Sequence, residues 1–425
     1  MHGSPRDSIP ISDHASRTDD VPAIVVGRGL TGLGTLRSLV LAGIPAYVAC
    51  PAGDLVTHSR WYRPLPGAGW DGTIDAQAEA RLQALPLTRA VFIAGADDAA
   101  MWLAERAQRG ADARFSVSSS TVRTLEILQD KDRFGALLAD SGLSHPRTFP
   151  LQRREDVARI PFAELDRIFL KPVDSQRFSL TFGYKGVWVD GEAELLAAWE
   201  PLHAAGHAMV AQEYIPGASS DHYFLDGFRD RHGQLCGLMA RRRLRIYPPD
   251  FGNSSYCHTV PLDELAGASA DLSRLLAALD YRGIFSAEFK RDARTGQHCL
   301  LEINTRAWWY VEFAAHCGVN VAAMAYADAL EQPVPHASRH YAAAGCVSFD
   351  GDLATVMRQR LDLKGWLRVL SQWWRAHYHV LRRDDPRPGL WFARQWLRHR
   401  WNGLFARNES DHRPADSTTG GSLRR

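Results

Sequence analysis

The feature that most limits how this chain can fold is a pair of short segments, residues 283–292 and 300–306, that alternate apolar with polar side chains. Alternation with a period of two is typical of a half-buried β-strand. The residues that join the two segments, Asp292-Ala-Arg-Thr-Gly-Gln297, have the composition of a hairpin turn. The sequence therefore predicts an antiparallel hairpin over residues 283–306.

The polar side chains of this hairpin are expected on one face, because residues two apart on a strand point to the same side. They are Ser286, Glu288 and Lys290 on the first strand and Glu302, Asn304 and Arg306 on the second. Leu301 and Ile303 are expected on the opposite face. Two carboxylates and an amide oxygen would then meet beside cationic groups, and such oxygen ligands suit Mg²⁺ held against nucleotide phosphates. The alternative, a hairpin whose polar face only meets water, is disfavoured by the strict register of these groups.

The length and composition are those of a large globular protein. A chain of 425 residues is expected to form about two to four structural units. Its formal charge of +2 gives no overall signal for a nucleic-acid partner. The six cysteines have no metal-ligand spacing, so reduced thiols in a cytoplasmic protein are the simplest interpretation. No segment reaches the roughly 18 uncharged residues of a membrane span, and residues 1–20 lack the apolar core of a secretory signal.

The order of the predicted elements indicates an α/β protein. Apolar strands at 23–27, 46–50 and 90–94 alternate with helical spacing at 31–42, which favours a doubly wound, Rossmann-like parallel sheet over residues 21–115. A helix at 132–141 should end at Gly142, and another helix is expected at 271–279. Shorter strands are expected at 168–171, 186–189, 209–214, 222–228 and 235–243. Residues 1–20 and 408–425 are predicted to be disordered tails.

A glycine-rich turn, Gly27-Arg-Gly-Leu-Thr-Gly32, stands between the first predicted strand and the first helix. This is the setting of a dinucleotide fingerprint, in which the helix N-terminus receives an anion. The second strand should then end in an acid for the ribose hydroxyls, but it ends Ala49-Cys50-Pro51 and the nearest acid is Asp54. Nicotinamide dinucleotide binding therefore ranks below a structural or substrate-binding turn.

Several other positions could contact a nucleotide. Lys171 ends a predicted strand and Lys131 begins a helix, where a lysine can reach a phosphate, although such lysines are usually surface residues. The segment Gln212-Glu-Tyr-Ile-Pro-Gly217 leaves a strand for a loop, where backbone groups could read an adenine edge. The basic run Arg241-Arg-Arg-Leu-Arg245 could neutralise phosphate, but a solvated charge run is the usual explanation. The sequence contains no P-loop, GxSxG, HExxH or kinase motif.

Taken in order, these parts resemble the ATP-grasp superfamily over about residues 115–335. The resemblance lies in the order and approximate spacing of Lys131, Lys171, the 212–217 segment, Glu288 and Glu302-Ile-Asn304. It is closest to the carboxylate–amine ligase branch that includes D-aspartate ligases, with the carbamoyl-phosphate synthase large chain more distant. It implies a Rossmann-like domain at 21–115 and ATP-grasp lobes at 116–205 and 206–335. After about residue 335 the composition changes, which predicts a basic, Trp-rich helical region at 336–407.

The resemblance also implies roles for single residues. The ATP phosphates would be bound by Lys131 and Lys171. Adenine would be held by Glu213 and the backbone of Tyr214 and Ile215, and ribose by Asp221 or alternatively Ser219 or Ser220. Mg²⁺, or Mn²⁺ in its place, would be bound by Glu288, Glu302 and Asn304. Catalysis would involve Lys171 and Arg306, with the arginine steadying the acyl phosphate and the transferred phosphoryl group.

Two positions depart from the usual pattern of this superfamily. The loop at 174–183 lacks the glycine-rich phosphate lid of many relatives, which affects lid closure and phosphate contacts. Thr305 stands where proline is common, between the asparagine and the arginine, and this change is minor.

The C-terminal region has an unusual composition. Residues 364–407 contain ten Lys and Arg, six Trp and only two acids, Asp384 and Asp385. Helices with basic and aromatic faces can lie on an anionic membrane or bind an acidic acceptor. The favoured interpretation is a helical cap whose tryptophans pack on the catalytic core, because large aromatic side chains more often supply core contacts.

The leading hypothesis is an ATP- and Mg²⁺-dependent ligase. It would join a small-molecule carboxylate, for example an amino acid, to an amine through an acyl phosphate and release ADP and phosphate. Lysines, Mg²⁺ and arginine would offset the charge of the transferred phosphoryl group, so no nucleophilic serine or cysteine is required. Two alternatives are a nicotinamide-dependent oxidoreductase that uses the glycine-rich turn, and a nucleotide-binding module without turnover.

Overall fold

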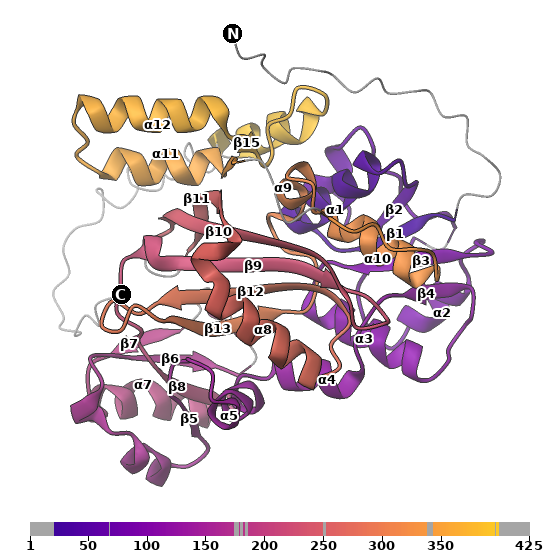
Figure 1. Ribbon diagram of the computed structural model, residues 1–425. Helices are drawn as coiled ribbons and strands as arrows, with labels where there is room; N and C mark the ends of the chain where they lie inside the picture. Colours follow the sequence, from indigo (N-terminus) through magenta and orange to yellow (C-terminus); the bar gives the residue numbers. More distant parts are fainter. Residues whose placement is uncertain are drawn as a thin grey trace, which may run out of the picture.

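The computed structural model describes residues 21–67, 69–173, 178, 182, 186–249, 252–337, 343–395 and 397–398. The predicted tails and most of the loop at 174–183 lie outside the described residues. The protein is a mixed α/β molecule with three sheets that are covered and joined by helices (Figure 1). Within the described ranges, no helix combines the length and apolar character that a membrane crossing needs.

The first sheet has four parallel strands in the order β2-β1-β3-β4. Its strands are β1 (Ala23–Val26), β2 (Ala46–Ala49), β3 (Ala90–Ala94) and β4 (Phe115–Val117), connected through α1 (Gly29–Leu41), α2 (Ala78–Gln83) and α3 (Asp97–Gln108). Strand β1 is buried throughout, because Ala23 and Val25 pack with α1 while Ile24 and Val26 pack with α2 and α3. A strand covered on both faces reads as a continuous apolar run. The strands predicted at 23–27, 46–50 and 90–94 are confirmed.

The second sheet is small and antiparallel, with the order β5-β8-β6-β7. Helices α4 (Val122–Gln129) and α5 (Lys131–Ser141) lead into it, and α5 ends at Gly142 as predicted, with a left-handed φ of 67°. The strands are β5 (Thr148–Leu151), β6 (Ile168–Pro172), β7 (Val187–Val189) and β8 (Met209–Glu213). Helix α7 (Glu192–Ala204) buries its apolar side chains against them.

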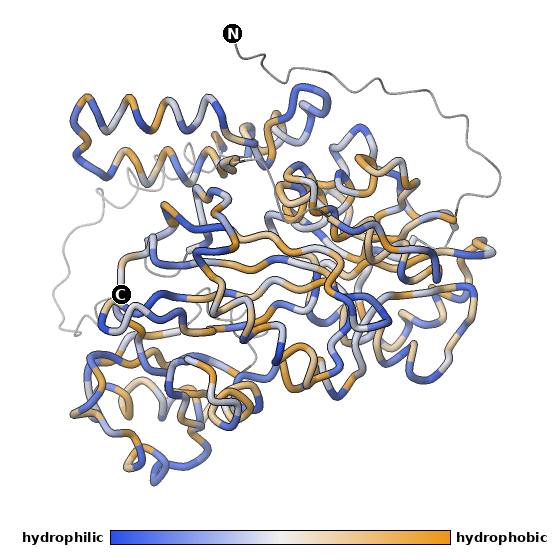
Figure 2. The backbone as a smooth tube through the Cα atoms, in the orientation of Figure 1, coloured by the Kyte–Doolittle hydropathy of each residue, from blue (hydrophilic) through white to orange (hydrophobic). Residues whose placement is uncertain are grey.

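The third sheet has seven strands in the order β13-β12-β9-β10-β11-β14-β15. They are β9 (His222–Arg229), β10 (Leu235–Tyr247), β11 (Asn253–Val260), β12 (Gly283–Arg291), β13 (His298–Asn304), β14 (Gly345–Val347) and β15 (His377–Tyr378). Helix α8 (Ala266–Ala278) packs on one face, and α9 (Val311–His316) and α10 (Val321–Ala329) pack on the other. Figure 2 shows hydrophobic residues along these strands and hydrophilic residues in many of the turns between elements.

The predicted hairpin at 283–306 is confirmed as β12 and β13, at one edge of the third sheet. Glu288 pairs directly with Glu302, and Ser286 pairs with Asn304. The two acids that the sequence places on one face are therefore direct cross-strand neighbours.

The expectation for Leu301 is wrong, because the hairpin contains a bulge. The register shifts between Glu288 and Phe289 of β12, so that Leu300 lies opposite Phe289 and Leu301, just before Glu302, is the extra residue. Leu301 therefore lines the same cleft as Glu302, whereas Leu300 and Ile303 are buried in the core beneath the sheet.

A shared core joins the first sheet to the third. Val91 and Ile93 of β3 belong to one buried cluster with Phe228 of β9 and Phe313 of α9. The first sheet and its helices α1, α2 and α3 are called the first unit below. This packing fixes the first unit against the face of the third sheet that carries α9 and α10.

The C-terminal helices form a cap on the third sheet. Helices α11 (Phe349–Arg358) and α12 (Leu363–Arg375) lie side by side, with α11 packed over β10 and β11 and α12 in contact with β14 (Figure 1). Val369 and Trp373 of α12 are buried with Tyr256 and Val347, as the cap interpretation requires. Trp374 departs from that interpretation, because 82% of its surface is exposed.

Candidate active site

A cleft of about 610 Å³ lies between the second and third sheets. Its walls come from β6, β7 and β8 on one side and from β9, β10, β12 and β13 on the other. Its volume is that of a pocket for a nucleotide-sized ligand. Six residues predicted from the sequence line it together: Lys171, Glu213, Tyr214, Ile215, Glu288 and Glu302.

Two glutamates form the acidic wall of the cleft. Glu288 and Glu302 are opposite each other across β12 and β13, so their side chains share one face of the sheet. Like charges in this position repel each other and destabilise a sheet by themselves. Their placement in a cleft indicates a site that favours a cation.

Neighbouring donors keep Glu288 ionised. His222 Nδ1 lies 2.6 Å from Glu288 Oε1, and Arg243 donates to the same oxygen at 3.2 Å. Burial alone would raise the pKa of Glu288, but Arg243 and His222 lower it to about 2. Burial lowers the pKa of His222, while its hydrogen bond to Glu288 opposes that shift.

Two lysines line the cleft with lowered pKa values. Burial and the charge of Lys131 lower the pKa of Lys171 to about 8, while Glu302 opposes the shift. Burial also lowers the pKa of Lys290 to about 8, and its Nζ lies 4.2 Å from the ring centroid of Tyr214. A buried ammonium group is costly, so each lysine gains from an incoming anion such as a phosphate.

The backbone of the 213–215 segment is largely committed to the second sheet. The N–H groups of Glu213 and Tyr214 donate to carbonyls at 2.8 Å and 2.9 Å. Pro216 has no N–H, so Ile215 supplies the remaining backbone donor of this turn in the described part of the chain. Phe169 and Trp188, with ring centroids 4.7 Å apart, add an aromatic wall beside it.

The carboxylate of Glu213 is bound by two arginines. It accepts from Arg147 Nε at 3.3 Å and from Arg294 at 3.1 Å. These contacts tie β8 to the turn between β12 and β13, and so connect the two walls of the cleft. In this arrangement the side chain of Glu213 has a structural role.

The structure does not bring every predicted residue to the cleft wall. Asp221 accepts a hydrogen bond from Ala218 N–H at 2.8 Å and closes its own turn, whereas Ser219 lines the cleft. Lys131 lies nearby and donates to the carbonyl of Val173 at 3.0 Å. The alternative assignment of ribose to Ser219 is therefore the better placed of the two.

Arg306 lies beside the cleft and is held by the first unit. It pairs with Asp97, at the start of α3, through two bonds of 2.9 Å and 3.2 Å. It also donates to Asn304 Oδ1 at 3.3 Å, and Asn304 donates to Glu302 at 3.3 Å. A chain of polar contacts thus runs from Asp97 to the acidic wall.

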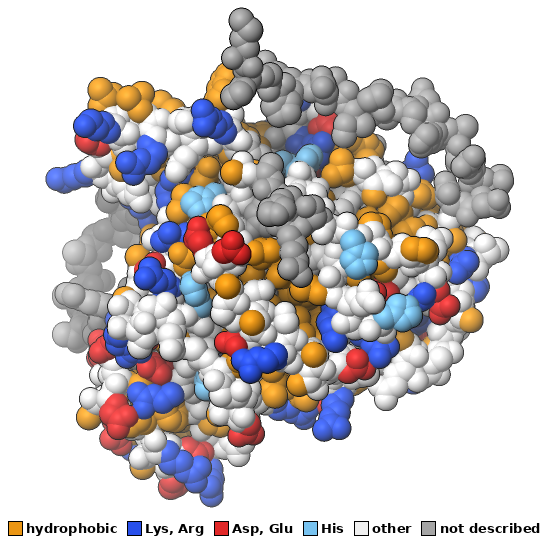
Figure 3. Space-filling view, in the orientation of Figure 1, with side chains coloured by type: hydrophobic (Ala, Val, Ile, Leu, Met, Phe, Trp, Pro, Cys, Tyr) orange, Lys and Arg blue, Asp and Glu red, His pale blue; other side chains and the backbone are white. Residues whose placement is uncertain are grey.

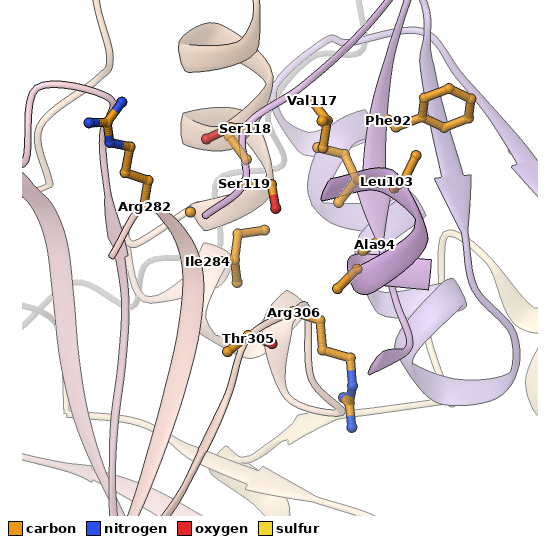
Figure 4. A pocket seen from close by; sticks show the side chains of 14 residues that line it. Phe92, Ala94, Leu103, Val117, Ser118, Ser119, Arg282, Ile284, Thr305 and Arg306 are labelled. Atoms are coloured by element: carbon orange, nitrogen blue, oxygen red, sulfur yellow. The ribbon is translucent and has the colours of Figure 1, made fainter. Parts of the chain in front are cut away.

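Figure 4 shows Thr305 and Arg306 opposite Ala94 and Leu103 of the first unit, around a second cavity. This cavity measures only about 20 Å³, which is room for about one water molecule. The larger cleft is therefore the candidate nucleotide site.

The interpretation of the 241–245 run as a solvated charge run is wrong. Arg241, Arg243 and Arg245 are each less than 10% exposed, and each pairs with an acid: Asp226 at 2.6 Å, Glu288 at 3.2 Å and Asp352 at 2.7 Å. The spacing of two residues places Arg241 and Arg243 on one face of β10, whereas a register shift between Arg243 and Arg245 sets Arg243 opposite Cys257 and Arg245 opposite Tyr256. This two-residue spacing is the sequence pattern from which Arg243 could have been predicted as a site residue. His222 has no local sequence signal, because its partner is 66 residues away.

The glycine-rich turn of the first unit already holds an anion. Gly29 N–H donates to both carboxylate oxygens of Asp54, at 2.9 Å and 3.1 Å, and Val56 N–H donates to one of them at 2.9 Å. The carboxylate thus occupies the helix N-terminus where a dinucleotide would place its pyrophosphate. This arrangement supports the interpretation of a structural turn.

No protein-family model matches this sequence, and no curated protein is significantly similar to it. Solved structures do match. N5-carboxyaminoimidazole ribonucleotide synthetase from Thermus thermophilus is 16% identical with a TM-score of 0.57, over 77% of this chain and 82% of that protein. L-amino acid ligase from Bacillus licheniformis is 15% identical with a TM-score of 0.55, over 75% and 76%.

A third similar structure is the biotin carboxylase domain of Hydrogenobacter thermophilus 2-oxoglutarate carboxylase, in complex with MgADP, ADP and bicarbonate. It is 15% identical with a TM-score of 0.57, over 76% of this chain and 72% of that chain. All three are ATP-grasp enzymes, and the chain described here has the ATP-grasp fold.

Proposed function

We propose that this protein is an ATP-dependent ligase that joins a carboxylate to an amine through an acyl phosphate and releases ADP and phosphate. The observation that carries the proposal is the cleft in which Glu288 and Glu302 stand opposite each other with Lys171 in the same lining. Such a cleft offers separate places for a cation and for phosphate charge. The L-amino acid ligase among the similar structures supports an amino acid as one substrate.

The donor set of the acidic wall fits a divalent cation. Glu288 is ionised at any physiological pH, and both of its described hydrogen bonds fall on Oε1, so Oε2 is the atom suited to coordinate. Glu302 and Asn304 add oxygen atoms of the kind that Mg²⁺ or Mn²⁺ prefers. The bound ion would offset the negative charge of the ATP phosphates.

The chain's own residues would perform the remaining steps. Lys171 and Lys290 would bind and orient the phosphates, with Lys131 behind Lys171. Ile215 and the Glu213 carbonyl would hold adenine against the aromatic wall. Arg306, fixed by Asp97, would stabilise the charge of the acyl phosphate as the carboxylate attacks the γ-phosphorus of ATP. The amine then displaces phosphate and an amide bond forms.

We also assign the units in terms of this function. Residues 21–115 would form the Rossmann-like domain that precedes the module, and 116–205 and 206–335 would be its two nucleotide-binding lobes. Residues 336–407 would be an added cap.

The test is hydroxylamine trapping with purified protein, ATP, Mg²⁺ and a panel of amino acids and other carboxylates. A hydroxamate should accumulate together with ADP, because hydroxylamine intercepts an acyl phosphate. AMP and pyrophosphate as products would refute the mechanism. Glu302→Gln should abolish turnover with the melting temperature retained, whereas the exposed control Glu264→Gln on another surface should behave like the wild type.

A further inference from the structure

Helix α12 has two apolar faces, of which only one is used by the fold. Val369 and Trp373 are buried against the third sheet. At 100° per residue, a second apolar stripe follows about a quarter turn away, and it consists of Leu363, Leu367, Leu370 and Trp374. These four side chains are 76%, 59%, 51% and 82% exposed.

This exposed stripe is long and continuous. Leu363 and Trp374 are eleven residues apart, which corresponds to about 16 Å along a helix. Figure 3 shows hydrophobic side chains along the outer edge of the cap, bordered by Lys and Arg. Single exposed leucines are common on proteins, but four in helical register are not required by the fold.

The charged side chains of α12 are all positive, and the acid that precedes the helix, Asp362, caps it by accepting a hydrogen bond from Gly365 N–H at 2.8 Å. Lys364, Arg368 and Arg375 are exposed and lie next to the stripe on the helical wheel, and α12 itself contains no acid. In the described chain after Asp362 there are two acids and both are in ion pairs, the partly exposed Asp384 with Arg382 and the buried Asp385 with the buried Arg37.

We propose that the outer face of α12 binds the surface of an anionic membrane, with the helix parallel to the lipid plane. The apolar stripe would enter the boundary of the acyl chains, Trp374 would sit at headgroup level, and the basic row would contact lipid phosphates. A second copy of the chain fits less well. A stable protein interface uses roughly 20–30 residues on each side, and the stripe has four, with a basic row that would face its own copy.

The experiment is vesicle flotation of the full-length protein. Vesicles of phosphatidylcholine mixed with phosphatidylglycerol should carry the protein, vesicles of phosphatidylcholine alone should not, and added salt should weaken the binding. Leu367→Glu should abolish flotation, while Leu235→Glu, at a leucine 39% exposed at the start of β10, should not change it. Lys364→Gln with Arg368→Gln should weaken partitioning by roughly 25-fold, at about five-fold per basic residue. The matched double variant Arg89→Gln with Arg109→Gln, elsewhere on the surface, should bind like the wild type.

Several results would overturn the proposal. Equal binding to neutral and anionic vesicles, or none to either, removes the role of the basic row and of the lipid. A wild-type dimer in solution that Leu367→Glu converts to a monomer shows that the face is a self-interface. Normal flotation of Leu367→Glu, with wild-type melting temperature, shows that the stripe does not bind lipid.

Discussion

A buried ion pair between Arg37 and Asp385 connects the C-terminal cap to the first unit. Removal of this ion pair should destabilise the protein strongly. Arg37 of α1 and Asp385 are both fully buried. Arg37 donates to Asp385 Oδ2 from Nε at 3.1 Å and from a terminal nitrogen at 2.8 Å. Ser59 and the N–H of Arg60 donate to the same carboxylate at 2.8 Å and 2.9 Å. The change Asp385→Asn keeps the shape of this side chain and removes its charge.

The magnitude follows from what remains around Arg37. Loss of one partner from a buried ion pair costs about 3–5 kcal/mol, because the other charge stays buried without compensation. Glu312 still lies 3.4 Å from Arg37, so the lower part of this range, about 3 kcal/mol, is expected. With a urea slope of about 3 kcal/mol per M, the unfolding midpoint should fall by about 1 M.

The assay is urea unfolding followed by tryptophan fluorescence and circular dichroism. The matched control is Glu126→Gln, which breaks the exposed pair with Arg133 at 2.7 Å and should cost less than about 1 kcal/mol. The double variant Arg37→Met with Asp385→Leu should recover much of the lost stability, since neither charge of this pair remains and Glu312, which loses Arg37, keeps its ion pair with Arg382. An unfolding midpoint for Asp385→Asn equal to that of the control would show that this pair does not hold the cap.

Further predictions concern the cleft. ATP affinity should decrease as pH rises through about 8, because Lys171 and Lys290, both with a pKa lowered to about 8, are charged below that pH and neutral above it. In Lys171→Met the affinity, measured by calorimetry, should be roughly ten-fold weaker at pH 7 and should vary less with pH; an unchanged profile would contradict the assignment. Asp97→Asn should lower kcat roughly ten-fold with little change in the KM for ATP, since it frees Arg306 without touching the nucleotide. The Arg306–Asp97 pair, whose side chains are 21% and 35% exposed, should contribute little to the melting temperature. A wild-type kcat would remove Arg306 from the reaction.

The hairpin could be predicted from the sequence because the residues that determine it are close together in the chain. Alternating residues and a glycine-containing turn determine that β12 and β13 pair, and they place Glu288 and Glu302 on one face. The bulge at Leu301 could not be predicted, because it depends on which residues the core beneath accepts. The apolar alternation fails at this one position, and Leu301 joins the cleft as a result.

Residues whose partners are distant in the chain were not predictable in the same way. Arg306 is bound by Asp97, 209 residues earlier, and Glu288 is held by His222 and Arg243 from two other strands. A periodic pattern in the sequence cannot predict such pairs, because they form only when the sheet is assembled. The arginines of β10 show the intermediate case: their two-residue spacing predicts a shared face, but not that the face is buried.

The glycine-rich turn after β1 has a structural role that depends on its contact with the turn after β3. A Cβ on Gly27 would lie 3.1 Å from the Cα of Gly95, so the turns that follow β1 and β3 touch backbone to backbone. Gly95 is two residues before Asp97, and the carbonyl of Ala94 accepts a hydrogen bond at 3.1 Å from the N–H of Ala307. The close packing of Gly27 and Gly95 therefore positions two contacts that hold the segment around Arg306. They are the Arg306–Asp97 pair and the hydrogen bond from Ala307 N–H to the Ala94 carbonyl. In this chain the glycine-rich motif therefore helps to position the segment around Arg306 beside the cleft. The anion at the N-terminus of α1 is the protein's own Asp54 carboxylate.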